Sequence, residues 1–423
     1  MIRVLAAVVI PPHMSVSGAA RGAELLSAAL AKHCHVTLAS MMNCSNVPGC
    51  ADAIRRVQVE SWLPPALPWT LLPRKFSTLF YRSDLPRIVR EGDFDLVHIH
   101  NVLPALEMER VARSCTACCL PYVVSTHGFN EVANGADVYG FTGPKRLAWR
   151  LFVEGPVSRV VARASGIFAL SPADFNIVRG MGFRGPELSV VPNGVPIPGP
   201  ADPAKAKEIL EGLEIPAERK PGQITCMFLA NHTPNKGLPV LLEAFAGLER
   251  PYLLIVGGEK RSGIDYEGYV RNCRPGQRIV MTGRISDASV HVLYQRSDLF
   301  VFPTLADTFP LVVLEAMAHG IPVIASRVGG IPHQISGDCG VLVEPGDVAG
   351  LRSGLEKLAD EPERLSRMGH NARARALTEF TWCGAARAAV EGYRRILRSN
   401  SLIDLAAAHP AESFAGERST TKG

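Results

Sequence analysis

Short apolar runs alternate with helix-length amphipathic stretches along most of the chain. In the first half these runs, rich in Val, Ile and Leu, are Val4–Ile10, Val36–Ala39, Leu96–Ile99, Tyr122–Ser125, Ile167–Leu170 and Leu188–Val191. Short runs that are apolar throughout are typical of parallel strands that are buried on both faces, with helices as the crossovers. The pattern therefore predicts successive βαβ units around a parallel sheet.

The alternation stops once and then begins again. Proline and glycine are crowded between Pro192 and about Pro221, and because these residues interrupt regular structure we interpret the segment as a hinge. The apolar runs that follow it are Ile224–Ala230, Leu253–Val256, Arg278–Met281, Leu299–Phe302, Val323–Ala325 and Val341–Val343. A chain of 423 residues also exceeds the roughly 250–300 residues that one core supports, so a second sheet is expected.

These patterns predict an α/β chain of two Rossmann-like, doubly wound parallel-sheet domains that face each other across a cleft. The predicted divisions are a first domain at 1–195, a linker at 196–221, a second domain at 222–380, a C-terminal helix at 381–400 that packs back toward the first domain, and a disordered tail at 401–423. The tail is rich in Ala, Ser and Thr and has little periodicity, so it cannot build a packed core.

Composition excludes several other classes of protein. Apolar residues make up 47% and charged residues 20%, as in an ordinary globular protein, and no segment has the ~18 continuous apolar residues that a bilayer crossing needs. The run Val4–Ile10 fits a first strand better than a signal peptide, so a cytoplasmic protein is expected. The net charge of +5 is too small to indicate nucleic acid, although it agrees with anionic ligands or an anionic membrane surface.

The ten cysteines do not indicate a disulfide framework, which is typical of short secreted chains. Cys115, Cys118 and Cys119 contain a CxxC step, yet no second Cys or His pair follows at the spacing of a zinc site. Reduced thiols without a metal are therefore expected.

Ligands of doubly wound sheets bind beyond the carboxyl ends of the strands, so the segments that follow the predicted strands carry the candidate chemistry. After the first strand, Ser15–Gly22 is a run of small residues that leads into a helix, where backbone amides near Gly18 could hold a phosphate or an acceptor oxygen. Because the GxGxxG spacing is absent, a plain tight turn explains this run equally well.

Two further strands of the first half end near histidine. His127 lies in the segment Ser125–Gly128, where the glycine lets a ligand approach the backbone, although a single His is more often structural. His98 and His100 share one face of their strand, where buried hydrogen bonding is favoured over a metal pair. Since His100 ends the strand, it is the better candidate for the cleft.

In the second half, Lys236 and Gly237 follow the first strand and precede the amphipathic run Leu238–Leu248. A lysine at a helix N-terminus adds a full charge to the partial positive charge of the helix, which suits a diphosphate. The Walker spacing is missing, and a solvated surface lysine is an equally good interpretation of this motif alone.

The most informative segment runs from Asp307 to Pro322. It predicts a helix from about Phe309, with Asp307 before its start and Glu315 about two turns inside it. Two carboxylates at one cleft could accept hydrogen bonds from sugar hydroxyls. A helix N-cap at Asp307 and a buried ion pair at Glu315 are the structural alternatives.

Taken together, these segments resemble glycosyltransferase family 4, whose members have the GT-B fold, up to about Ser399. Asp307 and Glu315 match the family's acidic pair, with Asp where the first Glu is usual. The segment AMAHGIPVIASRVGGIP that follows resembles the strand and loop after this pair in the family. PNGV at Pro192–Val195 resembles the family's entry into the hinge. The resemblance implies a retaining hexosyltransferase of cell-surface polysaccharide or glycolipid biosynthesis. It would use a UDP- or GDP-sugar and would need no metal or other cofactor.

The resemblance also implies roles for single residues. Lys236 would contact the donor diphosphate, Asp307 the donor sugar and Glu315 the nucleotide ribose. His127 would lie beneath the sugar near the reacting centre, and Met281–Arg284 would pack on the nucleobase. The other donor-side candidates are Gly18, Asn231, Gly237, Arg284, Thr308, Phe309, Pro310 and Leu311, and the acceptor-side candidates are Gly18 and His100.

Two positions depart from the family's pattern. Asn231 stands where the family usually has Arg, which removes one bidentate clamp on phosphate, so either the donor binds more weakly or another cation such as Arg284 compensates. Asp307 in place of Glu shortens the side chain by one methylene and so bears on the preferred sugar.

The acceptor is expected to be a glycan, a lipid-linked molecule or a small molecule. The insertion Ser61–Arg90 suits an acceptor platform better than a nucleotide-sugar epimerase of the same fold, which is one alternative. A catalytically silent sugar-nucleotide-binding protein is the other, and the presence of Lys236, His127 and both carboxylates argues against it.

Aromatic and basic residues interleave in this insertion, which predicts either peripheral contact with the inner face of a membrane or a lid over a soluble substrate. The interleaved residues are Trp62, Leu63, Leu67, Trp69, Leu71, Leu72, Arg74, Lys75, Phe76, Phe80, Tyr81, Arg82 and Arg87.

Overall fold

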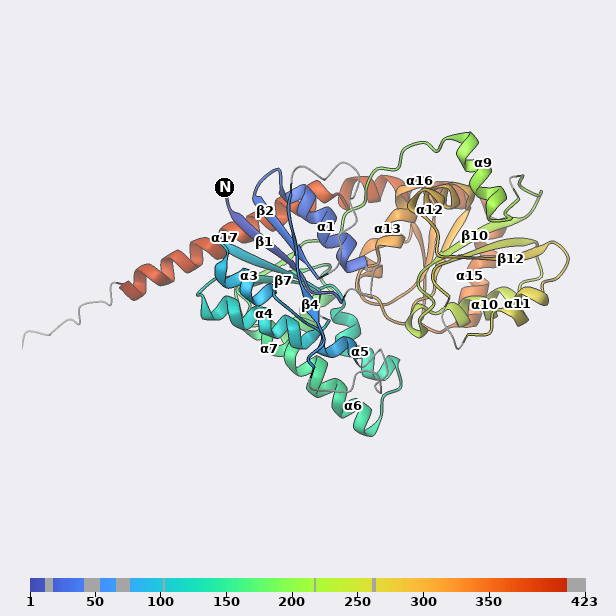
Figure 1. The fold of residues 1–423 in the computed structure, drawn as a ribbon. Helices are drawn as coiled ribbons and strands as arrows, with labels where there is room; N and C mark the ends of the chain where they lie inside the picture. Colours follow the sequence, from blue (N-terminus) through green and yellow to red (C-terminus); the bar gives the residue numbers. More distant parts are fainter. Residues whose placement is uncertain are drawn as a thin grey trace, which may run out of the picture.

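The computed structural model describes residues 1–11, 18–41, 54–65, 77–101, 103–216, 218–260 and 264–408, with side chains as far as residue 400. Two parallel sheets lie side by side along the molecule, each covered by helices (Figure 1). The first sheet is built from the first half of the chain and the second sheet from the second half.

The first sheet has seven strands in the order β3-β2-β1-β6-β7-β8-β9. Their bounds are β1 (Arg3–Val8), β2 (His35–Ser40), β3 (Arg55–Gln58), β6 (Leu96–His100), β7 (Tyr122–Ser125), β8 (Gly166–Ala169) and β9 (Glu187–Val190). Strands β6, β7 and β8 are buried along their whole length, as the continuous apolar runs predict.

Helices cover both faces of the first sheet. The helices of this half are α1 (Gly18–Leu30), α3 (Leu85–Glu91), α4 (Ala105–Ala117), α5 (Phe129–Val138), α6 (Gly143–Trp149), α7 (Gly155–Arg163) and α8 (Asp174–Gly180), with a π-helical turn η3 (Arg150–Glu154) after α6 and a 3-10 turn η2 (Thr78–Phe80). Apolar side chains of α3, α4, α5 and α7 form the core on one face, and those of α1 form part of the core on the other.

The second sheet has six strands in the order β12-β11-β10-β13-β14-β15. Their bounds are β10 (Ile224–Leu229), β11 (Tyr252–Gly257), β12 (Gln277–Gly283), β13 (Leu299–Phe302), β14 (Val323–Ser326) and β15 (Gly340–Val343). Its helices are α9 (Pro203–Gly212), α10 (Leu238–Ala246), α11 (Glu267–Arg271), α12 (Asp287–Arg296), α13 (Leu311–Ala318), α14 (Ile331–Gln334), α15 (Val348–Asp360) and α16 (Pro362–Glu379), and the 3-10 turn η4 (Pro234–Lys236) precedes α10.

The last helix, α17 (Trp382–Ala408), leaves the second domain and runs along the first sheet, in red in Figure 1. It packs against α1, β8 and β9. Tyr393 of α17 is fully buried there, and its hydroxyl lies 2.6 Å from Nδ1 of His98 on β6. The end of the chain is therefore part of the core of the first domain.

The predicted α/β class with two doubly wound parallel sheets is confirmed, and the predicted strands agree with the observed ones to within two residues at each end. The pattern misses β3 and the antiparallel pair of β4 (Ser61–Trp62) and β5 (Arg82–Ser83), because strands this short carry little periodicity. Helix α9 forms inside the predicted linker, and α17 extends to Ala408 within the predicted tail.

None of the helices in the described part of the chain is both long and apolar enough to cross a membrane. Much of the interleaved insertion, including Trp69, Arg74 and Lys75, lies outside the described residues.

Replacing Tyr393 by Phe should lower the free energy of unfolding of the first domain by ~1–3 kcal/mol, because Nδ1 of the buried His98 loses its partner. Denaturant unfolding followed by fluorescence measures this change. Tyr269→Phe is the matched control, since Tyr269 is half-buried on α11 and its hydroxyl has no recorded hydrogen bond within the described chain. Equal midpoints for the two variants would contradict the assigned role of Tyr393.

Candidate active site

Each sheet reverses its strand order beside loops that carry the candidate residues. In the second sheet the reversal lies between β10 and β13; Lys236 follows β10 and Asp307 follows β13. In the first sheet it lies between β1 and β6; Gly18 follows β1 and His100 ends β6. Such reversal points leave a crevice at the carboxyl ends of the strands, where ligands of this class of sheet bind.

The loop after β10 holds Lys236 against Asp307. Lys236 ends the turn η4, and Gly237 then takes a φ of 72° before α10 begins. A Cβ on Gly237 would lie 1.8 Å from the carbonyl oxygen of Pro303, so only glycine lets this loop come so close to the end of β13. Nζ of Lys236 donates a hydrogen bond to Oδ2 of Asp307 at 2.6 Å.

The ammonium group of Lys236 stays charged in this position. Burial opposes the charge, but the carboxylate of Asp307 and its hydrogen bond outweigh that effect, so the pKa of Lys236 is raised. The side chain is one-quarter exposed, which leaves it open to the cleft. A charged ammonium before the N-terminus of α10 suits a phosphate group.

The segment from Asp307 to Pro310 leads into α13. The helix begins at Leu311 with Pro310 as its N-cap, so the alternative reading of Asp307 as the N-cap is wrong. Gly329 packs against this segment, and a Cβ there would lie 2.0 Å from the carbonyl oxygen of Asp307. Thr308, like the two residues after it, is buried, which fixes the backbone behind the Asp307 carboxylate.

Glu315 lies on α13 with a largely buried carboxylate. The hydroxyl of Tyr294 donates to Oε2 at 3.3 Å, and a guanidinium nitrogen of Arg21 lies 3.8 Å from Oε1. Burial raises the pKa of Glu315, although the charge of Arg21 and the hydrogen bond from Tyr294 act in the opposite direction. The predicted ion pair is present, and its partner comes from the first domain.

Two asparagines of the first domain hold it against the Asp307 segment. Asn130 of α5 donates from Nδ2 to the carbonyl oxygen of Asp307 at 2.9 Å and from its backbone amide to Oγ1 of Thr308 at 3.4 Å. Nδ2 of Asn193 donates to the carbonyl oxygen of Phe309 at 3.2 Å. Asn130 is the third residue after His127, so these hydrogen bonds place the loop after β7, with His127, beside the second domain.

His127 is buried at this junction, and its burial lowers its pKa to about 4, so the imidazole is neutral at pH 7. Gly22 of α1 packs on the ring, since a Cβ on Gly22 would lie 3.3 Å from Cε1 of His127 and 3.2 Å from Oδ1 of Asn193. A neutral imidazole can exchange a hydrogen bond with a sugar hydroxyl without adding charge.

His98 and His100 differ although they share one face of β6. Their rings stack with centroids 3.9 Å apart, and both ring nitrogens of His98 are hydrogen-bonded, to the hydroxyls of Tyr393 and of Ser125. His100 is fully buried, and neither of its ring nitrogens has a partner among the described residues. Its ring centroid lies 6.1 Å from that of His127, so His100 keeps hydrogen-bonding capacity next to the site.

Gly18 does not have the close packing that its position suggests. It is the first residue of α1, and a Cβ there would meet nothing within 4 Å. The tight contact with the site belongs to Gly22, one turn farther along the helix.

Asn231 and Arg284 lie on neighbouring loops of the second domain. Gly258 packs against the Asn231 loop, where a Cβ would lie 1.7 Å from the carbonyl oxygen of Ala230. The Gly258 amide donates to the carbonyl oxygen of Gly283 at 2.9 Å. Arg284 is exposed, and its part in phosphate binding stays a prediction.

Two family models match the chain one after the other. Residues 16–197 match "Glycosyltransferase Family 4", and residues 214–375 match "Glycosyl transferases group 1". The D-inositol 3-phosphate glycosyltransferase 2 of Catenulispora acidiphila is 30% identical over 349 residues, which make up 77% of this chain and 75% of the relative. The chain belongs to glycosyltransferase family 4.

Solved structures agree with this assignment at the level of the fold. Sucrose-phosphate synthase from Thermosynechococcus elongatus has a TM-score of 0.69 at 20% identity, covering 94% of this chain and all of that one. HepE from Anabaena in complex with UDP-glucose has a TM-score of 0.65 at 17% identity, covering 95% and 100% of the two chains. The glycosyltransferase therefore has the GT-B fold that the resemblance implies.

Several site residues of this glycosyltransferase do not emerge from its sequence. Asn193 stands in the PNGV segment, where the pattern indicates only a hinge. Gly22 closes the small-residue run that drew attention to Gly18. Arg21 and Tyr294 carry no local signal, because each meets Glu315 only through tertiary packing: Tyr294 from the neighbouring helix α12 of the same domain, and Arg21 across the domain junction.

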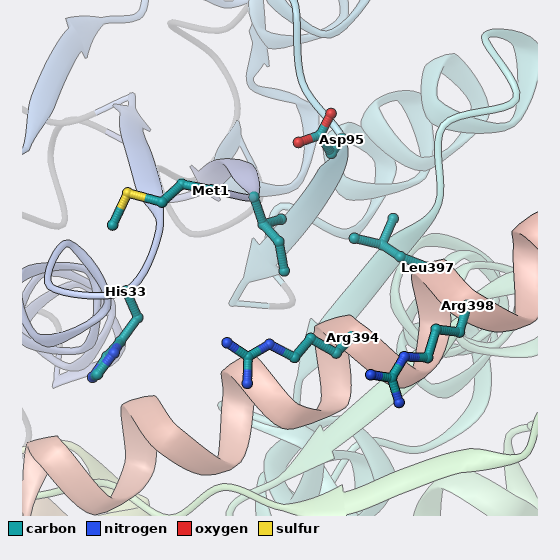
Figure 2. Close-up of a pocket in the computed structure, with 7 residues that line it drawn as sticks. Met1, His33, Asp95, Arg394, Leu397 and Arg398 are labelled. Carbon is teal, nitrogen blue, oxygen red and sulfur yellow. The ribbon is translucent and has the colours of Figure 1, made fainter.

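A cavity of about 460 Å³ lies away from these residues, beside α17 and the start of β1. Figure 2 shows Arg394 and Arg398 of α17 across from His33 and Asp95. It contains no candidate residue and lies at the amino ends of the strands, opposite the ligand-binding edge of the sheet.

Gly22→Ala should reduce the turnover number by a few-fold, on the order of 2–10-fold, because the added methyl group pushes the His127 ring or the Asn193 amide by a few tenths of an ångström, and a full 1 Å misplacement near the reacting centre can cost ~100-fold. Stability should not fall in proportion, since Ala is favoured over Gly inside a helix by ~1 kcal/mol. Steady-state kinetics and thermal unfolding measure the two effects. Gly212→Ala is the control, since Gly212 is an exposed glycine at the end of α9 with open space around its Cβ, and a similar loss of turnover in both variants would contradict the packing argument.

Proposed function

We propose that this enzyme moves a hexosyl group from a UDP- or GDP-sugar to an acceptor with retention of anomeric configuration. The observation that carries the proposal is the junction where Lys236, paired with Asp307, meets the loop of His127 through Asn130. A cation, a carboxylate and a neutral imidazole are thereby brought to one junction between the domains. A sugar diphosphate presents the matching groups, which are anionic oxygens and directional hydroxyls.

Lys236 is proposed to bind the diphosphate and to neutralise the charge that develops on it as the glycosidic bond breaks. The N-terminus of α10 adds its partial positive charge close by. This positive charge comes from the chain itself, so transfer is expected to need no metal and to persist in EDTA.

Asp307 and Glu315 are proposed to orient the donor. When the diphosphate takes over the ammonium of Lys236, the Asp307 carboxylate is free to accept hydrogen bonds from the sugar, and Glu315 accepts them from the ribose. His127, neutral at pH 7, would contact the sugar beside the reacting carbon. Retention is the outcome that the family resemblance implies.

The acceptor is proposed to enter on the side of the first domain, next to His100. Its ring nitrogens have no partner among the described residues and could hydrogen-bond an acceptor hydroxyl, and its ring centroid lies 6.1 Å from that of His127. A glycan, a lipid-linked molecule or a small polyol fits this chemistry. The Catenulispora relative is named as an inositol phosphate glycosyltransferase, which supports an acceptor rich in hydroxyl groups. HepE was solved with UDP-glucose, which supports a UDP-sugar as the donor.

Lys236→Ala should lower kcat/KM by ~100–1,000-fold and weaken the binding of the free nucleoside diphosphate, since removing one preorganised donor costs ~2.7–4 kcal/mol. Calorimetry with UDP and GDP, together with sugar-transfer assays, measures both effects. His127→Ala serves as the contrasting variant. Its turnover number should fall while its affinity for the nucleotide is kept, because His127 is proposed to contact the sugar and not the nucleotide. Normal activity in a folded Lys236→Ala protein would show that the diphosphate is held elsewhere.

Peripheral contact with an anionic membrane is proposed to bring a lipid-linked acceptor to this face. Leu147 of α6 and Leu151 of the following turn are each 57% exposed and lie one turn apart, and Lys145, Arg146 and Arg150 flank them. Exposed apolar side chains with basic neighbours suit the headgroup region of a bilayer. Trp62, in the part of the insertion that the structure describes, is 42% exposed.

The protein should therefore sediment with vesicles of anionic phospholipid at low salt and much less with neutral ones. The double variant Leu147→Ser/Leu151→Ser should lose this association and keep transfer to a soluble acceptor. Val270→Ser, at an exposed apolar position on α11 of the second domain, is the control. Equal sedimentation with both kinds of vesicle would favour the lid interpretation of the insertion.

A further inference from the structure

Arg21 bridges the two domains at the edge of the proposed donor site. It lies in the first turn of α1, directly before Gly22, which packs on His127. One guanidinium nitrogen donates to Oδ1 of Asp287 on α12 at 3.1 Å, and the other lies 3.8 Å from Oε1 of Glu315 on α13. The residue thus connects the helix that covers His127 with the carboxylate proposed to bind the ribose.

The two carboxylates of the site are paired in the same way. Asp307 faces the ammonium of Lys236, and Glu315 faces the guanidinium of Arg21. The hydroxyls of a nucleotide-diphosphate sugar can donate hydrogen bonds to the two carboxylates in place of Lys236 and Arg21. Its phosphates can in turn pair with these two cations in place of the carboxylates. Donor binding can therefore exchange both pairs at once, without leaving a buried charge unpaired.

The Arg21 pair is suited to such an exchange. Its side chain is 43% exposed, so the attraction is screened by solvent and contributes little to stability. Glu315 is only 15% exposed, so its carboxylate needs hydrogen-bond donors, which ribose hydroxyls can supply. The guanidinium has five N–H donors in a planar fork, so it can keep one contact with Asp287 while another edge turns to a phosphate.

We propose that Arg21 is a donor-binding residue supplied by the first domain, which leaves Glu315 when the ribose binds and pairs instead with the donor diphosphate. The inference rests on the proposed function, because it takes the diphosphate to lie at Lys236. It assigns the first domain a direct part in holding the donor, in addition to its part in binding the acceptor.

The test compares a nucleoside diphosphate with its nucleoside by calorimetry on the full chain, using UDP with uridine and GDP with guanosine. In Arg21→Ala the diphosphate should bind ~10-fold more weakly, as expected for the loss of one charge-assisted hydrogen bond. Binding of the nucleoside should not weaken, because Glu315 has lost a competitor. Arg21→Lys should recover part of the diphosphate affinity.

Asp287→Asn is the control for a purely structural bridge, since it removes the charge, and so weakens the other end of the interdomain contact, without removing a cation. It should leave diphosphate affinity unchanged or slightly higher. If Arg21→Ala weakens nucleoside and diphosphate equally, or if Asp287→Asn reproduces its effect, then Arg21 acts only as a bridge and the inference is wrong. Unchanged diphosphate affinity in Arg21→Ala also overturns it.

Lys236→Ala separates the two levels of the proposal. If this variant weakens diphosphate binding and Arg21→Ala does not, only the role of Arg21 fails. If neither variant weakens it, or if the wild-type protein binds neither diphosphate, the donor site itself is misplaced and the proposed function fails with it.

Discussion

The hydrogen bonds from Asn130 and Asn193 to the backbone of Asp307 and Phe309 are the constraint on which the site depends. Each sheet builds half of the crevice, and neither half contains a cation, two carboxylates and an imidazole by itself. The accepting carbonyl groups belong to a segment with buried neighbours, where an unpaired polar group is costly. The junction is therefore specific in position, and it sets the distance between the His127 loop and the Lys236–Asp307 pair.

The two sides of this junction differ in charge although burial disfavours the charged form on both. Burial holds His127 neutral, with a pKa of about 4, because no neighbouring carboxylate compensates for the loss of water. Lys236 is partly buried, yet it stays charged because the carboxylate of Asp307 lies 2.6 Å away. The junction thus combines a cation with an uncharged hydrogen-bonding ring, which is the combination that the proposed transfer from a sugar diphosphate calls for.

The C-terminal helix connects the stability of the fold to the same place. Tyr393 of α17 bonds to His98, His98 stacks on His100, and His100 lies next to His127. Since α17 begins directly after the second domain and packs against α1, β8 and β9 of the first, it is a second connection between the two domains besides the Asn130 contact. The helix therefore packs, through a row of aromatic rings, against the residues proposed to face the acceptor.

The sequence by itself determined the two doubly wound sheets and the loops that carry the chemistry, because strand burial has a local signature and ligands bind at the carboxyl ends of such strands. It pointed to Lys236, Asp307, Glu315 and His127 for the same reason. Only the tertiary structure decided which of these side chains are paired, and with what. Arg21 and Asp287 are 266 residues apart in the sequence, and His98 and Tyr393 are 295 residues apart. No periodicity along the chain therefore relates the members of either pair. His98 and His100 share one face of their strand, yet they differ because the tertiary structure brings hydroxyl partners to His98 alone: Ser125 from the neighbouring strand and Tyr393 from a distant helix.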